Sequence, residues 1–384
     1  MKPSRTMKGH ILITGGAGFI GSHLADALIE KGHHVRIFDN LLPIVHGEGC
    51  ERPVYLNPLA EFVRGDIRDF AQIENALEGI DAIYHLAALT GVGQSMYEIK
   101  DYVDVNISGT ANLLQAVLKD RHRIKKIILS SSRAVYGEGS YRCDHCGVLF
   151  PQARTYEQLN SGEWDFRCTR CHSILNPIPT GEEKPLDPIS IYGITKKVQE
   201  ELFRCAGGAY RIPFVILRYF NVYGERQSLS NPYTGIIPLF ITAVVNGLPP
   251  PVYEDGQESR DFVHVNDVVE ANLLALNDEK LNGTVLNVGT QQSFTIFDIA
   301  QIIIDKLRSP LRPEIVGKAR VGDIRHCIAD MSRIHSLSGY RPAVSFDKGI
   351  SELLQWILKQ KPDMKYKDPS VELGQKGLMA REKE

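Results

Sequence analysis

The chain has 384 residues, a length that suggests two domains or one large α/β domain with additions. Its composition, 43% hydrophobic and 23% charged, excludes a disordered or fibrous protein. Forty-four Lys and Arg against 46 Asp and Glu give a formal net charge of -2. This balance lacks the basic surplus of a nucleic-acid binder, and no apolar run is long enough to span a bilayer. We therefore expect neither nucleic acid nor a membrane as a partner.

The N-terminus and the cysteines indicate the compartment. Residues 1–8 are basic but lead into a short apolar run that ends at Gly15, which is typical of a buried strand rather than a signal peptide. Seven cysteines is an odd number for a disulfide framework. These features predict a cytoplasmic protein whose cysteines are free thiols or metal ligands.

Short apolar runs alternate with amphipathic stretches along the first two-thirds of the chain. The predicted strands are 10–14, 35–38, 61–63, 82–86, 126–129 and 214–217. The predicted helices are 19–31, 70–77, 106–119, 195–204, 238–246, 295–307 and 349–359. Continuously apolar strands separated by helices predict an α/β fold, a Rossmann-type doubly wound parallel sheet. The polar stretch after Lys361 predicts a loosely held tail.

A glycine-rich turn, Gly15 to Gly21, follows the first strand and opens the first helix. Glycines allow a tight turn and a close approach of the backbone to a pyrophosphate, which the free N–H groups of the helix then bind. Asp39 ends the next strand and can accept from both ribose hydroxyls, which favours NAD over NADP. Arg36 could tolerate NADP, but it lies in the middle of a strand.

Tyr192 and Lys196 are four residues apart and share one face of a predicted helix. A nearby ammonium and a positive nicotinamide ring would stabilise the phenolate, so that the tyrosine could act as a base. Ser132 follows the strand 126–129, at the edge of the sheet where ligands bind. These three residues predict a proton-transfer site.

Cys143, Cys146, Cys168 and Cys171 form two C-x-x-C pairs with 21 residues between them. This spacing is typical of a four-cysteine zinc site, which is structural because no coordination position stays open. Two disulfides, a redox pair and an iron–sulfur centre are the alternatives.

Together these motifs resemble the extended short-chain dehydrogenases/reductases of the nucleotide-sugar epimerase/dehydratase family. The matching segments cover about three-quarters of the chain; they are 14–21, 39–40, 65–67, 85–88, Asn106, 129–137, 192–196, 218–224 and 259–263. The resemblance implies a bound NAD, a nucleotide-diphosphate sugar as substrate and a homodimer formed through two helices of each subunit.

The resemblance also assigns residues to roles. The catalytic residues would be Ser132, Tyr192 and Lys196. The cofactor would be bound by Gly15, Gly18, Phe19, Ile20, Gly21, Asp39, Asn40, Asp66, Ile67, Leu86, Ala87, Ala88, Asn106, Tyr192 and Lys196. The substrate would be bound by Ser132, Arg133, Asn221, Arg260 and Arg325.

The two residues that follow the catalytic serine distinguish the dehydratases of the family from its epimerases. The family's dehydratases have acidic residues there, whereas this chain has Arg133 and Ala134. Without a carboxylate at these positions, removal of a C5 proton or protonation of a leaving hydroxyl lacks its catalyst. The sequence therefore favours a 4-epimerase.

The cysteine pairs lie between Ser132 and Tyr192, where the resemblance implies an insertion of about 35 residues. A zinc ion would staple a segment too small to fold alone, and we expect it to order a lid beside the substrate. The insertion, together with 91–98 and 230–235, resembles the subgroup of dTDP-L-rhamnose 4-epimerases.

The predicted organisation is an NAD-binding Rossmann domain (8–221, with 259–290 returning to it), a zinc-ribbon insertion (138–181), a smaller C-terminal sugar-nucleotide domain (222–258 and 291–362) and a tail (363–384). A UDP-glucose/galactose-type 4-epimerase, and a dehydratase, decarboxylase or reductase of the same fold, remain alternatives. So does a non-catalytic NAD-binding scaffold whose ribbon docks a partner.

Overall fold

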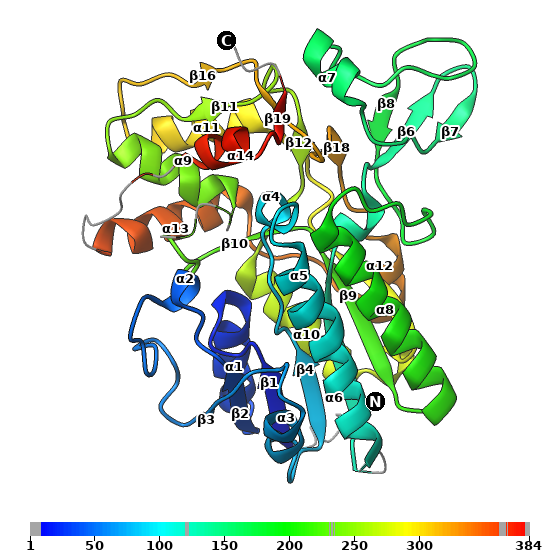
Figure 1. Cartoon of the computed structure of the whole chain (residues 1–384), viewed down its shortest axis with the longest axis vertical. Helices are drawn as coiled ribbons and strands as arrows, with labels where there is room; N and C mark the ends of the chain where they lie inside the picture. The colour runs from blue at the N-terminus through cyan, green and yellow to red at the C-terminus, as the bar shows by residue number, and fades with distance from the viewer. Residues whose placement is uncertain are drawn as a thin grey trace.

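The computed structural model describes residues 9–119, 123–229, 231, 233, 235–360, 366 and 368–380 (Figure 1). The basic stretch 1–8 therefore lies outside the described residues. Within the described part, no helix combines the length and the apolar character needed to cross a membrane.

A parallel sheet of seven strands forms the centre of the described chain (Figure 1). The strands other than the edge strand β3 are largely buried because helices cover both faces, which explains their continuous apolar runs. The order reverses between β1 and β4, so a ligand crevice is expected at their carboxyl ends. In spatial order the strands are β14 (Thr284–Val288), β9 (Phe214–Tyr219), β5 (Lys126–Ser132), β4 (Ala82–His85), β1 (His10–Thr14), β2 (His34–Asp39) and β3 (Glu61–Arg64).

Two apolar cores, one on each face of the sheet, hold the surrounding helices against it. The first packs α1 (Phe19–Glu30) against α10 (Val265–Asn277), joined by α12 (Ser332–Ser338) beside β14. The second lies under α3 (Phe70–Ala76), α6 (Gly109–Lys119) and α8 (Ile191–Tyr210). The helix predicted over 106–119 starts earlier, because α5 (Ile99–Tyr102) continues through a π-helical turn (Val103–Ser108) into α6. Short helices in the connections are α2 (Pro43–His46), α4 (Val92–Ser95), η2 (Arg133–Tyr136) and η3 (Glu279–Leu281).

The C-terminal part forms a third core between α9 (Ile236–Val245), α11 (Ile296–Lys306) and α13 (Phe346–Lys359). Short strand pairs connect it to the sheet. They are β10 (Asn221–Tyr223) with β13 (Phe262–His264); β11 (Pro251–Val252) with β16 (Glu314–Ile315); and β15 (Phe294–Thr295) and β18 (His326–Cys327) on either side of β12 (Ser259–Arg260).

The insertion folds as a separate small unit beside the C-terminal part (Figure 1). It contains the antiparallel strands β6 (Ser140–Cys143), β7 (Gly147–Leu149) and β8 (Asn176–Ile178), and the helix α7 (Tyr156–Ser161). Its buried cluster contains Tyr141, Phe166 and Leu175 with Cys143 and Cys168. A core of this size rarely stabilises a small segment by itself.

The expectation of a loosely held tail is wrong for residues 368–380. This segment forms α14 (Pro369–Gln375) and β19 (Met379–Ala380), and β19 pairs antiparallel with β17 (Ala319–Arg320). Leu373, Met379 and Ala380 are buried. Three apolar anchors at helical and strand positions are enough to dock a segment that looks polar on average.

Candidate active site

The glycine turn has the backbone geometry that a dinucleotide requires. Gly15 has a φ of +70°, and a Cβ there would lie 2.6 Å from the backbone N of Ala87. A Cβ at Gly21 would lie 2.5 Å from the carbonyl oxygen of Gly15. Gly18 begins α1 without a side-chain cap, so the first N–H groups of the helix face outward. Such a helix start binds the phosphates of a dinucleotide.

Asp39 is held at the end of β2 by two backbone N–H groups. Its Oδ2 accepts from Ala17 at 3.0 Å and its Oδ1 from Leu41 at 2.9 Å. Burial raises the pKa of this carboxyl above its usual value. A carboxylate has about four acceptor positions, so acceptors remain for two ribose hydroxyls. Arg36 is directed elsewhere, because its Nε donates to Glu61 at 2.9 Å.

A cavity of about 340 Å³ extends from the glycine turn to the ends of β5 and α8. The predicted cofactor residues that line it are Gly15, Gly18, Phe19, Ile20, Gly21, Asp39, Asn40, Ile67, Leu86, Ala87, Ala88, Tyr192 and Lys196. The cavity has further lining residues to which the sequence analysis assigned no site role. They are Phe38, Leu42, Val45, His46, Gly65, Thr90, Val105, Ser130, Ser131, Tyr219, Phe220, Val222, Arg226, Gln227, Ser228 and Asn231.

Two predicted cofactor residues lie behind the wall of the cavity. Asp66 accepts from Arg68 and from the amide of Asn40 at 3.1 Å, and the hydrogen bond from Arg68 lowers its pKa to about 2. Asn106 is fully buried and bonds both backbone groups of Leu89 and the hydroxyl of Thr195. The π-helical turn places Asn106 there, so it positions α8 and the loop after β4.

Ser132, Tyr192 and Lys196 all line the same cavity. Tyr192 and Lys196 lie one turn apart in α8, whose start is capped by Ser190. The backbone N–H of Tyr192 donates to the hydroxyl of Ser95 at 3.0 Å, which ties α8 to α4. Nζ of Lys196 donates to the carbonyl oxygen of Ser130 at 2.9 Å. The sequence-predicted proton-transfer residues therefore come together.

The charges around Tyr192 differ from the expectation. Burial raises the pKa of Tyr192, while a hydrogen bond from Ser132 and the charge of Arg133 lower it. Burial also lowers the pKa of Lys196 to about 7, partly offset by Glu200. The charge of Arg133 thus lowers the pKa of Tyr192, besides the Lys196 ammonium that the sequence predicts for this role.

The four predicted substrate residues beyond Ser132 have different surroundings. Arg133 is partly exposed. Partial burial and the charge of Arg260 lower its pKa, and its own charge lowers the pKa of Tyr192 and of Asp323. Oδ1 of Asn221 is buried with no hydrogen-bond partner among the described residues. Such an orphan acceptor fits a ligand hydroxyl or amide.

Arg260 and Arg325 are bound by the protein itself. Arg260 donates to the carbonyls of Ser259, Ile324 and Arg325, and pairs with Asp323 at 3.1 Å. Arg325 donates to Asp165, Glu254 and both oxygens of Asp255. These carboxylates occupy the guanidinium fork of Arg325 in the structure, so a substrate diphosphate would have to displace them. The substrate-binding role of Arg325 stays a prediction.

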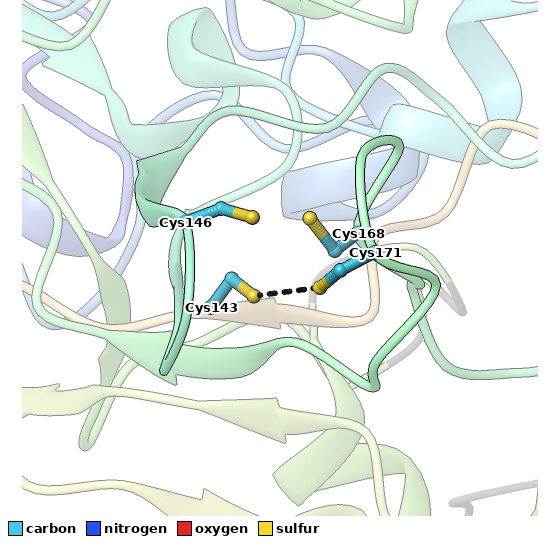
Figure 2. Close-up of side chains that lie close together, drawn as sticks. All are labelled: Cys143, Cys146, Cys168 and Cys171. Carbon is cyan, nitrogen blue, oxygen red and sulfur yellow. Dashed lines mark hydrogen bonds between the residues drawn. The ribbon is translucent and has the colours of Figure 1, made fainter.

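The four cysteines of the insertion converge on one point, as Figure 2 shows. Their sulfur atoms all lie within 4.8 Å of one another, and Sγ of Cys143 is 3.4 Å from Sγ of Cys171. A tetrahedron with Zn–S bonds of about 2.3 Å has sulfur separations of about 3.8 Å. All four are free thiols, so the donor set fits a tetrahedral zinc better than two disulfides do.

The insertion attaches to the C-terminal part through buried ion pairs. Arg154 makes a bidentate pair with Glu254 at 2.7 and 2.8 Å, and Asp165 pairs with Arg325. Glu138 accepts from the backbone N–H groups of Arg325 and His326, both at 2.8 Å. Among the described residues that line the cavity, none belongs to 138–181, and of the predicted substrate residues only Ser132 lines it. The expected lid role of the insertion beside the substrate stays a prediction.

The sequence model of a protein family described as "NAD dependent epimerase/dehydratase family" matches residues 11–157 and 172–289, more than half of the chain. This chain belongs to that family. The unmatched residues 158–171 lie inside the insertion and include its second cysteine pair, Cys168 and Cys171. The family, the cofactor turn and the proton-transfer residues together make the chain an enzyme with a nucleotide-sugar epimerase/dehydratase fold.

Three curated relatives carry different activities. A dTDP-L-rhamnose 4-epimerase of Burkholderia thailandensis is 38% identical over 91% of this chain and 95% of its own. A putative UDP-glucose 4-epimerase of Methanocaldococcus jannaschii is 34% identical over 90% and 98%. A UDP-N-acetyl-alpha-D-glucosaminuronate decarboxylase of Bacillus cytotoxicus is 32% identical over 91% and 98%.

A solved structure supports the cofactor. UDP-glucuronic acid 4-epimerase from Bacillus cereus, in complex with UDP-glucuronic acid and NAD, superposes with a TM-score of 0.74 at 28% identity. The similarity covers 92% of this chain and all of that one. This chain therefore has the same fold as an epimerase whose structure contains NAD.

Proposed function

We propose that this protein is an NAD-dependent nucleotide-sugar 4-epimerase. The observation that carries the proposal is the convergence of Ser132, Tyr192 and Lys196 on one cavity, with Arg133 and Ala134 next in the chain. These residues supply a base and a hydrogen-bond donor for a sugar hydroxyl, but no carboxylate for dehydration.

The cofactor would be held by the glycine turn and by Asp39, and when bound it accepts and returns a hydride at C4. Tyr192 takes the proton of the C4 hydroxyl, and the hydroxyl of Ser132 hydrogen-bonds the same oxygen. Arg133 stabilises the phenolate form of Tyr192. After the 4-keto sugar has turned about its diphosphate, Tyr192 returns the proton to the oxygen on the opposite face. There is no net redox change.

The best-supported substrate is dTDP-L-rhamnose. The 38% identity to a dTDP-L-rhamnose 4-epimerase, the four-cysteine insertion and the segments 91–98 and 230–235 support it. A UDP-glucose/galactose-type 4-epimerase is the alternative within the same chemistry. NMR of the products formed from dTDP-, UDP- and GDP-sugars tests the choice, and loss of water or CO₂ from a sugar would overturn the epimerase assignment.

We further propose one structural zinc ion per subunit, bound by Cys143, Cys146, Cys168 and Cys171. The convergence of four free thiols supports this assignment. Thiols persist in a reducing compartment, which supports a cytoplasmic location. Metal analysis of protein purified without chelators tests the zinc site.

A homodimer through two helices of each subunit is the proposed assembly. Ile99 and Val103, on α5 and the π-helical turn, and Ile194 on α8 are apolar and solvent-exposed on neighbouring helices. An exposed apolar patch of this kind is typical of a subunit interface. Light scattering after gel filtration, with Ile99→Asp as the disrupting variant, tests it.

A further inference from the structure

The C-terminal segment 368–380 is clamped to two loops that wall the cavity. Both oxygens of the Glu372 carboxylate accept hydrogen bonds, one from the hydroxyl of Tyr97 at 2.8 Å and one from that of Tyr233 at 2.9 Å. Each hydroxyl has one proton, so both protons are used on the same carboxylate. Burial is the largest cause that raises the pKa of Tyr97, and it raises the pKa of Tyr233 to about 12, so both phenols stay protonated at neutral pH.

The two tyrosines belong to segments that reach the active site. Thr90 lines the cavity and precedes α4, which Tyr97 follows, while Asn231 lines it two residues before Tyr233. These are the segments 91–98 and 230–235 that the sequence singled out. The clamp therefore joins two separate parts of the wall through one residue of the C-terminal segment.

An apolar contact presses the same segment onto α4. Leu373 is fully buried, and a Cβ added at Gly93 would lie 3.3 Å from its Cδ2. The hydroxyl of Ser95, in α4, accepts from the backbone N–H of Tyr192 at 3.0 Å. The helix α4 therefore contacts both the C-terminal segment and the backbone of the catalytic tyrosine.

The other end of the segment rests on the insertion. β19 pairs with β17, Met379 facing Arg320 in the register, and the N–H of Val321 donates to the carbonyl oxygen of Leu378 at 2.9 Å. Ala319 and Ala380 pack with Leu159 of α7, and Trp164 packs against this cluster. Figure 1 shows α14 and β19 lying between α9 and β12, above α4. The insertion thus packs against the C-terminal end of the segment and supports it.

A polar group beneath the segment lacks a partner. Arg320 pairs through Nη2 with Asp323 at 2.6 Å, but its Nε is buried with no hydrogen-bond partner among the described residues. The guanidinium lies near Tyr253 and near Tyr233, which belongs to the clamp. An unpartnered cationic donor under a clamped segment fits an anionic ligand enclosed there.

We propose that residues 368–380 form a strap that closes over the nucleotide-sugar end of the cavity and retains the sugar during turnover. This inference rests on the proposed epimerase activity, in which a 4-keto sugar must turn round without leaving. Retention requires a closed wall, since an escaped keto sugar leaves the enzyme with reduced cofactor. The insertion supports the strap by packing against β19.

Glu372→Gln and Leu373→Ala test the strap, and Val371→Ala is the matched control because Val371 is 61% exposed on the same helix. With dTDP-L-rhamnose, we expect both variants to raise KM about fivefold to tenfold, as the loss of one or two hydrogen bonds or an apolar anchor predicts. Reduced nicotinamide should also accumulate during turnover. Val371→Ala should match the wild type.

Hydrogen–deuterium exchange gives a second readout that does not depend on turnover. Adding dTDP to the wild-type enzyme should slow exchange of amides in 369–380, and Glu372→Gln should abolish this protection. Wild-type KM with no reduced cofactor in both variants, or no protection by dTDP, overturns the strap. If the wild type converts no nucleotide sugar, the proposed function fails instead, and exchange with dTDP still decides the strap. If Leu373→Ala does not fold, Glu372→Gln decides.

Discussion

The ammonium of Lys196 donates to the carbonyl oxygen of Ser130, 2.9 Å away at the end of β5. This bond ties the buried Lys196 of α8, one turn from Tyr192, to the end of β5. Burial lowers the pKa of Lys196 to about 7. The predicted proton-transfer residues therefore meet at the junction of β5 with α8.

Tyr192→Phe should leave folding and NAD binding intact while lowering kcat by at least about 100-fold, because the variant keeps the ring but loses the proton-transfer group. Steady-state kinetics and NAD titration calorimetry measure both quantities. Turnover within a few-fold of wild type would remove Tyr192 from the acid–base role.

Arg133→Gln should shift the pH dependence of kcat/KM to higher pH. Arg133 lowers the pKa of Tyr192, so its loss raises that pKa, and the fraction of the base form at a given pH falls. A pH profile of the variant beside the wild type measures the shift. An unchanged profile would show that the charge of Arg133 does not act on Tyr192.

The enzyme should prefer NAD to NADP, and Asp39→Ala should narrow the preference, because the buried carboxylate repels a 2′-phosphate. Calorimetric titrations of both proteins with both cofactors give the four affinities. Equal wild-type affinities for the two cofactors are incompatible with the placement of Asp39 at the ribose.

Cys143→Ser combined with Cys146→Ser should lose zinc and keep NAD, because the Rossmann core lies outside the insertion. Cys205→Ser is the matched control, since Cys205 is exposed on α8 and outside the cluster. Metal analysis measures the zinc content of each variant, and titration with NAD measures its cofactor affinity. A zinc-free wild type, or zinc retained in the double variant, contradicts the four-cysteine site.

Arg154→Met should lower the free energy of unfolding by about 2 kcal/mol or more, because it leaves Glu254 buried with Arg325 as its remaining partner. Arg142→Met changes an exposed arginine of the same insertion and should have little effect. Chemical denaturation of both variants makes the comparison. Equal midpoints would show that the buried pair does not stabilise the protein.

The sequence predicted every strand of the central sheet except β14, and it predicted that the candidate site residues lie together, because these signals are local. The glycine turn, Asp39 and the Tyr192–Lys196 spacing each lie within one supersecondary unit, and all of them line the cavity. The four cysteines also came together as their spacing predicted.

The errors concern partners that are distant along the chain. The sequence did not predict the carboxylate partners of Arg325, which lie 70 and 160 residues away. The tail was expected to be loose, yet Glu372 meets hydroxyls 275 and 139 residues away. Composition describes how polar a segment is, whereas docking depends on a few contacts that only the fold brings together.

The most direct test of the account uses nucleotide sugars that carry deuterium at C4, beginning with dTDP-L-rhamnose. NMR of the product should show inverted configuration at C4 with the deuterium retained, because the hydride leaves and returns at the same carbon. A product that has lost the C4 deuterium, water or CO₂, or that keeps its C4 configuration, would contradict the epimerase mechanism.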